Sequence, residues 1–209
     1  MITEILKCEK CWKVPALCLC EQIQPLKTKA SVLILQHPQE ARNPLTTARL
    51  VSLSLPHATH RVGLSFGSLK SALKREAATS PEWAVLYVGT KKESNKFVTD
   101  KPFQVFSRSG QAIESRGIKG IILLDGNWEQ SKTLWWRNSW LLKLNRVVLN
   151  PEFESEFKGV RKQPRKLCLS TIEATACALK GLGEKPETVD ALRTLFQKHV
   201  ELAKDFKKK

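Results

Sequence analysis

The feature that most constrains the fold is a set of short apolar runs without polar alternation. They occupy residues 29–37 (KASVLILQH), 83–89 (WAVLYVG), 118–126 (IKGIILLDG) and 146–151 (RVVLNP), with 165–170 (RKLCLS) as a further candidate. Such runs, rich in leucine and β-branched residues, are typical of strands covered on both faces. A sheet with one face in water would alternate apolar and polar residues instead. The chain is therefore predicted to form a mainly parallel sheet between layers of helices.

The segments between and after these runs have a helical pattern. Apolar residues recur near every third and fourth position in residues 44–55, 128–144, 170–183 and 188–206. That spacing predicts amphipathic helices and, with the strands, an α/β fold. Residues 90–117 carry the weakest pattern, so we expect this region to be rich in loops.

Four of the six cysteines are crowded near the start of the chain. They form a C-x2-C-x6-C-x-C pattern made by Cys8, Cys11, Cys18 and Cys20. Two close pairs can each chelate one side of a zinc ion, and metal binding can fold a segment too small for its own core. An iron–sulfur cluster would use the same thiolates, and packed reduced cysteines are a third interpretation. We expect a zinc-binding module over residues 1–27 and one domain over residues 28–209.

The charge balance indicates the class of partner. The chain has 35 Lys and Arg against 20 Asp and Glu, a net charge of +15. This balance suits a polyanion such as nucleic acid, and an acidic membrane surface is the competing interpretation. Because the longest apolar runs fall far short of the ~20 residues of a membrane span, no membrane partner is expected. The first residues lack the pattern of a signal peptide, so we expect a cytoplasmic protein with reduced cysteines.

The run that ends at Asp125 is the best candidate for a site. Ligands of open parallel sheets bind beyond the carboxyl ends of the strands, where each strand turns into its helix. Asp125 there is either the N-cap of the next helix or an acceptor carboxylate that faces a pocket. Trp128, beside the turn, is placed to stack on a base. The tryptophans farther along this helix cannot all point one way, so at least one belongs to the core.

The residues LLDGNW (123–128) and the helix after them resemble the Asp-x-Thr-Trp signature of the DTW-domain family, the tRNA-uridine aminocarboxypropyltransferases, which are related to the knotted SPOUT methyltransferases. Residues 35–50 (LQHPQEARNPLTTARL), residues 161–174 (RKQPRKLCLSTIEA) and the cysteine cluster are similar to further motifs of the family, in the family's order. The chain departs from the signature at Asn127, where the family usually has Thr. It also has Thr46 where relatives often show Asn.

This resemblance implies a SPOUT-like, knotted domain and a reaction. The 3-amino-3-carboxypropyl group of S-adenosylmethionine would move to N3 of a uridine in tRNA, releasing methylthioadenosine. N3 of uracil becomes a good nucleophile only when its proton is lost, so a carboxylate within reach can act as general base. Asp125, the first residue of the signature, is the expected base. Any zinc is then structural, because the chemistry needs no metal.

The resemblance also implies a cofactor site built from loops that follow several strands. By position, its residues are Leu86, Gly89, Leu124, Leu149, Leu167, Leu169, Ser170 and Thr171. A capping box competes for part of this set, because Ser170 and Glu173 have the spacing of an N-cap and its partner at N3. The helix that they open could still point its N-terminus at the carboxylate of the substrate.

Two groups of residues are candidates for contacts with RNA. Thr46, Thr47 and Arg49 carry hydroxyls and a guanidinium that suit a phosphate or the aminocarboxypropyl carboxylate. The second group is the basic stretch before the last motif, with Arg161, Lys162, Arg165 and Lys166. Phosphate contacts of this kind set the register that delivers one unstacked base to a pocket. His37, ahead of a proline at a strand end, is interpreted as a structural hydrogen-bonding residue.

Two other functions are compatible with the sequence. A SPOUT-type RNA methyltransferase would share the fold, the cofactor and the basic surface, but its by-product would be adenosylhomocysteine. A non-catalytic zinc-ribbon RNA-binding protein would bind tRNA and leave S-adenosylmethionine untouched.

Overall fold

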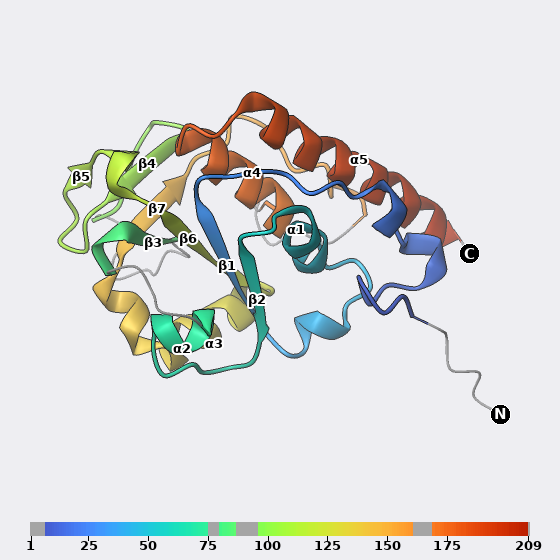
Figure 1. The fold of residues 1–209 in the computed structure, drawn as a ribbon, viewed down its shortest axis with the longest axis horizontal. Coiled ribbons are helices and arrows are strands. Elements are labelled where there is room, and N and C mark those ends of the chain that lie inside the picture. The colour runs from blue at the N-terminus through green and yellow to red at the C-terminus, as the bar shows by residue number, and fades with distance from the viewer. Residues whose placement is uncertain (1–6, 75–79, 87–95, 161–168, 209) are drawn as a thin grey trace.

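The computed structural model of the protein describes residues 7–74, 80–86, 96–160 and 169–208 (Figure 1). Some of the residues that we expect to contact ligands lie outside the described residues: Gly89, Arg161, Lys162, Arg165, Lys166 and Leu167.

One sheet forms the centre of the molecule. In the described ranges, seven strands pair in the order β2-β1-β6-β3-β7-β4-β5. The parallel strands are β2 (Ala58–Val62), β1 (Ser31–Gln36), β6 (Gly120–Asp125), β3 (Trp83–Leu86) and β7 (Asn145–Leu149). At one edge, β4 (Phe103–Phe106) and β5 (Ala112–Ile113) continue the sheet in antiparallel fashion. The carboxyl ends of the five parallel strands therefore meet along one edge.

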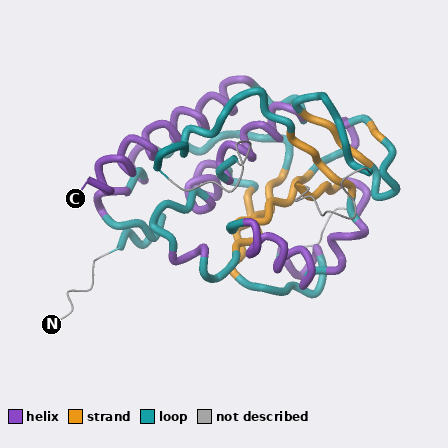
Figure 2. Tube along the Cα trace, turned by 180° about the vertical axis from the view of Figure 1, so that it is seen from behind, coloured by secondary structure: helices purple, strands orange, loops and turns teal. Residues whose placement is uncertain are grey.

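Helices cover both faces of this sheet. They are α1 (Ala48–Ser54), α2 (Leu69–Leu73), α3 (Trp128–Arg137), α4 (Thr171–Gly181) and α5 (Pro186–Lys208). Short 3-10 turns occur at Pro15–Leu17, Cys20–Gln22, Glu40–Arg42, Ser80–Glu82, Ser115–Gly117 and Ser139–Lys143. Figure 1 shows α1, α4 and α5 on one side of the sheet and α2 and α3 on the other; Figure 2 shows the same layers from behind.

Each face of the sheet has its own core, because successive residues of a strand point to opposite sides. Ile34 and Ile121 pack into the cluster that contains α1, α4 and α5. Leu35 and Ile122 pack into the cluster that contains α2 and α3. Double coverage explains why the central strands are apolar throughout. The predicted mainly parallel α/β sheet is confirmed.

The helix predicted over residues 128–144 is in fact two elements that meet at Asn138. This side chain is 1% exposed. Its Nδ2 donates to the carbonyls of Leu134 (2.7 Å) and Leu64 (3.0 Å), and its Oδ1 accepts from the backbone N–H of Phe66 (2.7 Å). A side chain that bonds backbone groups in this way competes with the helical ladder, so α3 ends there.

Among the described residues, the sequence pattern missed one α-helix and three strands. β2 and α2 were not predicted, and β4 and β5 lie in the region expected to be rich in loops. β2 (ATHRV) is an edge strand whose residues are half-buried or exposed, so it lacks an apolar run. The pairing of β4 and β5 depends on the neighbour β7 rather than on their own short sequences. Leu169 and Ser170, from the further candidate run, lie in no strand.

The cysteine segment packs directly against the sheet domain. Leu17 is fully buried and Leu19 is 2% exposed, and both belong to the core that includes α4 and α5. Lys13, between the two cysteine pairs, is also buried. The N-terminal segment is thus in contact with the fold that carries Asp125.

None of the helices that the structure describes combines the length and apolar content needed to cross a bilayer.

Candidate functional site

Asp125 lies at the carboxyl end of β6, in the middle of the sheet. Its register partner on the adjacent parallel strand is Gln36, the last residue of β1. Both side chains are buried, with 6% of Asp125 and 1% of Gln36 exposed. The carboxylate thus stands at the strand-end position where open parallel sheets bind ligands.

Three side chains from distant parts of the chain donate hydrogen bonds to this carboxylate. Gln36 Nε2 donates to Asp125 Oδ2 at 2.7 Å and to Thr46 Oγ1 at 2.9 Å. Thr46 Oγ1 donates to the same Oδ2 at 3.3 Å, and Thr171 Oγ1 donates to Oδ1. Donors on both oxygens stabilise the carboxylate relative to the carboxylic acid. The arrangement fixes the orientation of an ionised group that can accept a proton or bind a cationic centre.

The alternative role of Asp125 as a helix cap is wrong, because Asn127 caps α3. Asn127 Oδ1 accepts from the backbone N–H of Gln130 at 3.0 Å, and Gln130 Oε1 accepts from the backbone N–H of Asn127 at 2.8 Å. This reciprocal pair is a capping box, in which Asn and Thr are both suitable N-caps. The departure from the family's Thr at this position therefore keeps a capping residue in place.

The threonines of residues 44–55 face the centre of the site, whereas Arg49 faces the cysteine segment. Thr46 contacts Asp125, and Thr47 Oγ1 accepts from the backbone N–H of Ile172 at 3.2 Å. Arg49 Nε donates to the carbonyl of Lys10 at 2.8 Å, and its guanidinium lies 4.2 Å from the ring centroid of Trp12.

His37 contacts backbone groups of its own loop and of the adjacent strand β6. Its Nδ1 accepts from the N–H of Gln39 at 3.2 Å, and its backbone N–H donates to the carbonyl of Asp125 at 2.9 Å. Burial lowers the pKa of His37. These contacts agree with a structural role.

The predicted cofactor-binding residues that the structure describes lie at the same edge of the sheet as Asp125. Leu86, Leu124 and Leu149 are at or near the carboxyl ends of β3, β6 and β7. All three leucines are half-buried: Leu86 and Leu149 pack on one core, and Leu124 packs on the other. Leu169 precedes α4 and packs on the first core.

The start of α4 has the predicted capping box. Ser170 Oγ accepts from the N–H of Glu173 at 3.3 Å, and Glu173 Oε2 accepts from the N–H of Ser170 at 2.8 Å. Glu173 is 5% exposed and also accepts from Ser155 Oγ at 2.7 Å. The N–H groups of Ile172 and Glu173 already have acceptors, so any attraction of α4 for a substrate carboxylate depends on its dipole rather than on these two groups.

The tryptophans of the signature helix divide as the pattern predicts. Trp135 is core, at 3% exposed, whereas Trp136 is 67% exposed. Trp140 is half-buried, and its Nε1 donates to the carbonyl of Phe66 at 2.8 Å. Trp128 is half-buried at the start of α3, with Lys132 Nζ 5.0 Å from its ring centroid. Trp128 therefore keeps a partly accessible indole beside the turn.

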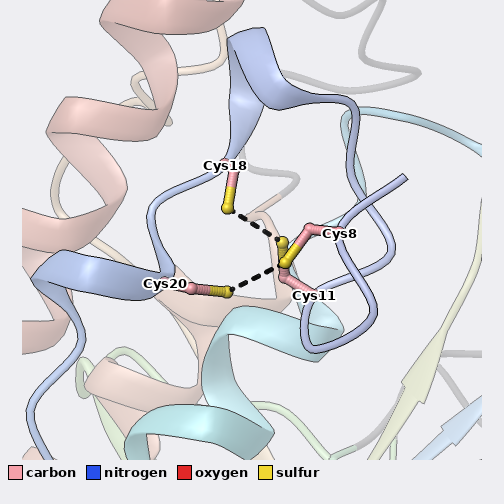
Figure 3. A group of neighbouring side chains, drawn as sticks. All are labelled: Cys8, Cys11, Cys18 and Cys20. Atoms are coloured by element: carbon pink, nitrogen blue, oxygen red, sulfur yellow. Dashed lines mark hydrogen bonds between the residues drawn. The ribbon is translucent and has the colours of Figure 1, made fainter. Parts of the chain in front are cut away.

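The four N-terminal cysteines bring their sulfurs together (Figure 3). All four sulfurs lie within 4.8 Å of one another, with 3.7 Å between Cys8 and Cys20 and 3.7 Å between Cys11 and Cys18. A tetrahedral zinc site with Zn–S bonds of about 2.3 Å places its sulfurs roughly 3.8 Å apart. The donor set and its spacing therefore fit one tetrahedral metal ion.

The thiol pKa values in this cluster differ. A hydrogen bond from the backbone of Cys11 lowers the pKa of Cys8 to about 6, whereas burial raises the pKa values of Cys11 and Cys20. The lowered pKa of Cys8 favours its thiolate form, which is the form that binds metals.

Sequence reasoning missed three polar residues that contact this centre. Gln36 donates to Asp125, and its Oε1 lies 3.0 Å from His60 Nε2. Lys13 donates to the backbone of the loop that carries Thr46. Burial lowers the pKa of His60 to about 4 and that of Lys13 to about 8. A polar residue that ends the apolar run of β1 is the signal that could have identified Gln36.

A small pocket of about 30 Å³ lies between the cysteine segment and the loop before α1. The basic residues on its wall are Lys7, Lys13, Arg42 and Arg49. Trp12, Gln36 and Thr46 also line it, and none of the lining residues that the structure describes is acidic. The pocket adjoins the hydrogen-bond network of Asp125 and has the charge to attract an anion.

The family model of the DTW domain matches residues 5–204, a range that contains all of these motifs. The chain belongs to the DTW-domain family. The resemblance seen in the sequence is thereby confirmed.

Relatives of this chain from an insect, a mammal and a plant are named as tRNA-uridine aminocarboxypropyltransferases. The mouse (Mus musculus) tRNA-uridine aminocarboxypropyltransferase 2 is 29% identical over 178 residues, which cover 83% of this chain and 55% of the mouse protein. The Drosophila melanogaster tRNA-uridine aminocarboxypropyltransferase 2 is 30% identical over 190 residues, 87% of this chain and 68% of the fly protein. The Arabidopsis thaliana tRNA-uridine aminocarboxypropyltransferase A is 24% identical over 203 residues, 88% of this chain and 75% of the plant protein.

The matched region thus spans little more than half of the mouse relative. No solved structure gives a significant match to this DTW-domain chain.

Proposed function

We propose that this chain transfers the 3-amino-3-carboxypropyl group of S-adenosylmethionine to N3 of a uridine in tRNA and releases methylthioadenosine. One observation carries the proposal: three family motifs, far apart in the sequence, converge on one carboxylate. Thr46, Asp125 and Thr171 come from the first, second and last of these motifs and are joined by hydrogen bonds. The names of the relatives supply the reaction and the substrate class.

In this mechanism Asp125 is the general base. The carboxylate accepts the N3 proton of an unstacked uracil that enters beyond the ends of β1 and β6. The N3 electron pair then forms a bond to the methylene carbon next to the sulfonium. The carbon–sulfur bond breaks, and its electron pair leaves with methylthioadenosine. Gln36, Thr46 and Thr171 hold the carboxylate ionised and oriented, so the site needs little reorganisation when the uracil enters.

The co-substrate is expected along the edge of the sheet next to this carboxylate. Leu86, Leu149 and Leu169 offer apolar surface and backbone groups for the adenosine, and the N-terminus of α4 favours the carboxylate of the alkyl chain. Gly89 and Leu167 remain candidates on sequence grounds. A SPOUT-like, knotted topology is part of the same proposal.

The tRNA would be held by basic groups on two sides of the site. The pocket lined by Arg42, Arg49 and Lys7 offers cations for a backbone phosphate near Thr46. Arg161, Arg165 and Lys166 are proposed to contact further phosphates, and Trp128 to stack on a base. These phosphate contacts fix the register of the RNA, and the shape of the pocket selects the base.

Zinc is proposed as a structural ion held by Cys8, Cys11, Cys18 and Cys20. When bound, it supplies a rigid cross-link between the two cysteine pairs, and no step of the reaction passes through it. In this proposal residues 1–27 form the zinc module and residues 28–209 form the catalytic domain.

The decisive experiment follows unmodified tRNA by mass spectrometry after incubation with S-adenosylmethionine and either the wild-type chain or Asp125→Asn. We expect an aminocarboxypropyl mass on a uridine together with methylthioadenosine, and a loss of at least roughly 100-fold in rate in the variant. The variant keeps the shape of the side chain and removes its negative charge.

The by-product separates the alternatives. A methyl mass with adenosylhomocysteine would assign the chain to the RNA methyltransferases. Binding of tRNA without consumption of S-adenosylmethionine would indicate a non-catalytic RNA-binding protein. Wild-type activity in Asp125→Asn would remove Asp125 from the role of base.

A further inference from the structure

Lys13 connects the cysteine cluster to the loop that presents Thr46. Its side chain is 2% exposed, and Nζ donates to the carbonyls of Pro44 and Thr46, each at 2.7 Å. A buried ammonium is unfavourable without such partners, so the two carbonyls and the cation stabilise one another. The contact joins residues that are more than thirty positions apart in the sequence.

The backbone of Lys13 belongs to the cysteine cluster itself. The N–H of Cys8 donates to the carbonyl of Lys13 at 2.8 Å, and the N–H of Trp12 donates to the carbonyl of Cys8 at 2.7 Å. Trp12 has a φ of 61°, a left-handed conformation that closes this tight turn. A metal ion bound by Cys8 and Cys11 would therefore fix the backbone of Lys13, and with it the base of the Lys13 side chain.

The loop between Asn43 and Thr47 depends on side chains for its shape. It precedes α1, and side chains bind three successive carbonyls: Lys13 those of Pro44 and Thr46, and His199 that of Leu45 at 3.2 Å. The hydroxyl of Thr46 meanwhile donates to Asp125. Displacement of the Thr46 carbonyl therefore also displaces the Thr46 hydroxyl, which donates a hydrogen bond to Asp125.

A second series of contacts runs in parallel. Arg49 donates to the carbonyl of Lys10 and covers the ring of Trp12. The ring of Trp12 lies 6.0 Å from that of His60, centroid to centroid. His60 in turn contacts Gln36, which donates to Asp125. The cysteine turn thus approaches the carboxylate from two sides.

We propose that Lys13 is a positioning residue: metal binding at the four cysteines fixes Lys13, and Lys13 fixes the loop that holds Thr46 against Asp125. The cysteine module then holds part of the site around Asp125 in place. The catalytic consequence rests on the proposed function, whereas the structural coupling does not.

Hydrogen–deuterium exchange tests the coupling without substrate. Exchange at Leu45 and Thr46 is compared in wild type, Lys13→Met and Lys10→Met, each with Zn²⁺ bound and after treatment with EDTA. Lys10 is exposed in the same turn, so its substitution removes a charge but leaves the hydrogen bonds from Lys13 to the carbonyls of Pro44 and Thr46. In wild type we expect EDTA to raise exchange at these amides about tenfold or more.

The effects of metal removal and of Lys13→Met should not be additive. Zinc-bound Lys13→Met should exchange about as fast as EDTA-treated wild type, and EDTA should then add less than about twofold. Lys10→Met should follow the wild type. Slow exchange in zinc-bound Lys13→Met, or effects of substitution and EDTA that multiply, would overturn the proposal.

Exchange in α5 reports whether the variant is folded. If Lys13→Met raises exchange there too, Lys13→Gln replaces it, since an amide can still donate to one of the two carbonyls. For Lys13→Gln, an intermediate exchange rate at Leu45 and Thr46 that remains partly sensitive to EDTA supports the positioning role of Lys13. A rate equal to that of the wild type rejects this role.

Steady-state kinetics tests the catalytic consequence. Because Lys13 acts through the orientation of the base, Lys13→Met should lower kcat about tenfold while KM for S-adenosylmethionine changes by less than about twofold. A rise in KM alone would show that Lys13 does not act on the base. If no variant and no wild type transfers a group, yet the exchange effects are non-additive, the coupling stands and the proposed function fails.

Discussion

Asp125 shows how much one side chain can depend on its neighbours. The apolar run before it predicts a strand end, but its donors come from Gln36, Thr46 and Thr171. Each donor satisfies part of a buried carboxylate that would otherwise be very unfavourable in the interior. Loss of one donor should therefore affect both stability and activity.

Thr171 offers the cleanest test at this scale. Thr171→Val keeps the shape of the side chain but removes the donor to Asp125 Oδ1, so the free energy of unfolding should fall by about 1–3 kcal/mol. We expect kcat to fall by roughly tenfold or more, because Asp125, the proposed general base, is then less firmly oriented. Thr171→Ser, which keeps the hydroxyl, is the matched control. Urea unfolding and tRNA modification rates measure the two effects; equal behaviour of the Val and Ser variants would show that the hydroxyl has no role.

Among the elements, α3 is defined at both ends by asparagine. Asn127 closes a capping box at its start, and Asn138 ends it by bonding backbone groups. Helix periodicity spans residues 128–144 without showing this break. The reason is that the partners of Asn138 include Leu64 and Phe66, which are distant in the sequence.

The cap can be tested through the family's own residue. Asn127→Thr should change the free energy of unfolding by less than about 0.5 kcal/mol, because Thr is also a suitable N-cap. Asn127→Ala should lower it by about 1 kcal/mol, since the N–H of Gln130 then loses its acceptor. Urea unfolding of the wild type, Asn127→Thr and Asn127→Ala measures these differences in the free energy of unfolding. A Thr variant as unstable as the Ala variant would mean that Asn127 contributes something other than a cap.

At the scale of the whole molecule, α5 connects the end of the chain to the site. His199 of this helix is fully buried, and its Nε2 lies 3.2 Å from the carbonyl of Leu45. Burial, with the nearby charge of Lys13, lowers the pKa of His199 to about 3. The C-terminal helix thus stabilises the same loop that Lys13 binds.

These buried histidines predict how stability depends on pH. In the folded protein His199 stays neutral down to a pH near its lowered pKa of about 3, whereas in the unfolded chain it takes up a proton near pH 6.5. The free energy of unfolding should therefore fall as the pH falls from about 6.5 to 5, by up to about 1.4 kcal/mol per pH unit for this residue. His60 contributes in the same direction. Above pH 7 neither residue adds a slope.

Urea unfolding between pH 5 and 7.5 measures this slope. His199→Gln keeps a possible donor to Leu45 but cannot titrate, so its slope should be shallower than that of the wild type. Identical slopes in the two proteins would show that His199 is not the source of the pH dependence.

Local sequence pattern was enough to predict the layers, the central strands and the cysteine cluster, because these features depend on apolar runs, helical spacing and close cysteine pairs. It also indicated Asp125, through its place at a strand end. The three-dimensional contacts were needed to show that Asp125 is not the N-cap of α3, and to show which residues surround it. Gln36, His60 and Lys13 act through contacts with residues distant along the chain, and β4 and β5 depend on a neighbouring strand. Such contacts leave no periodic signal, because folding brings together residues whose spacing in the sequence is arbitrary.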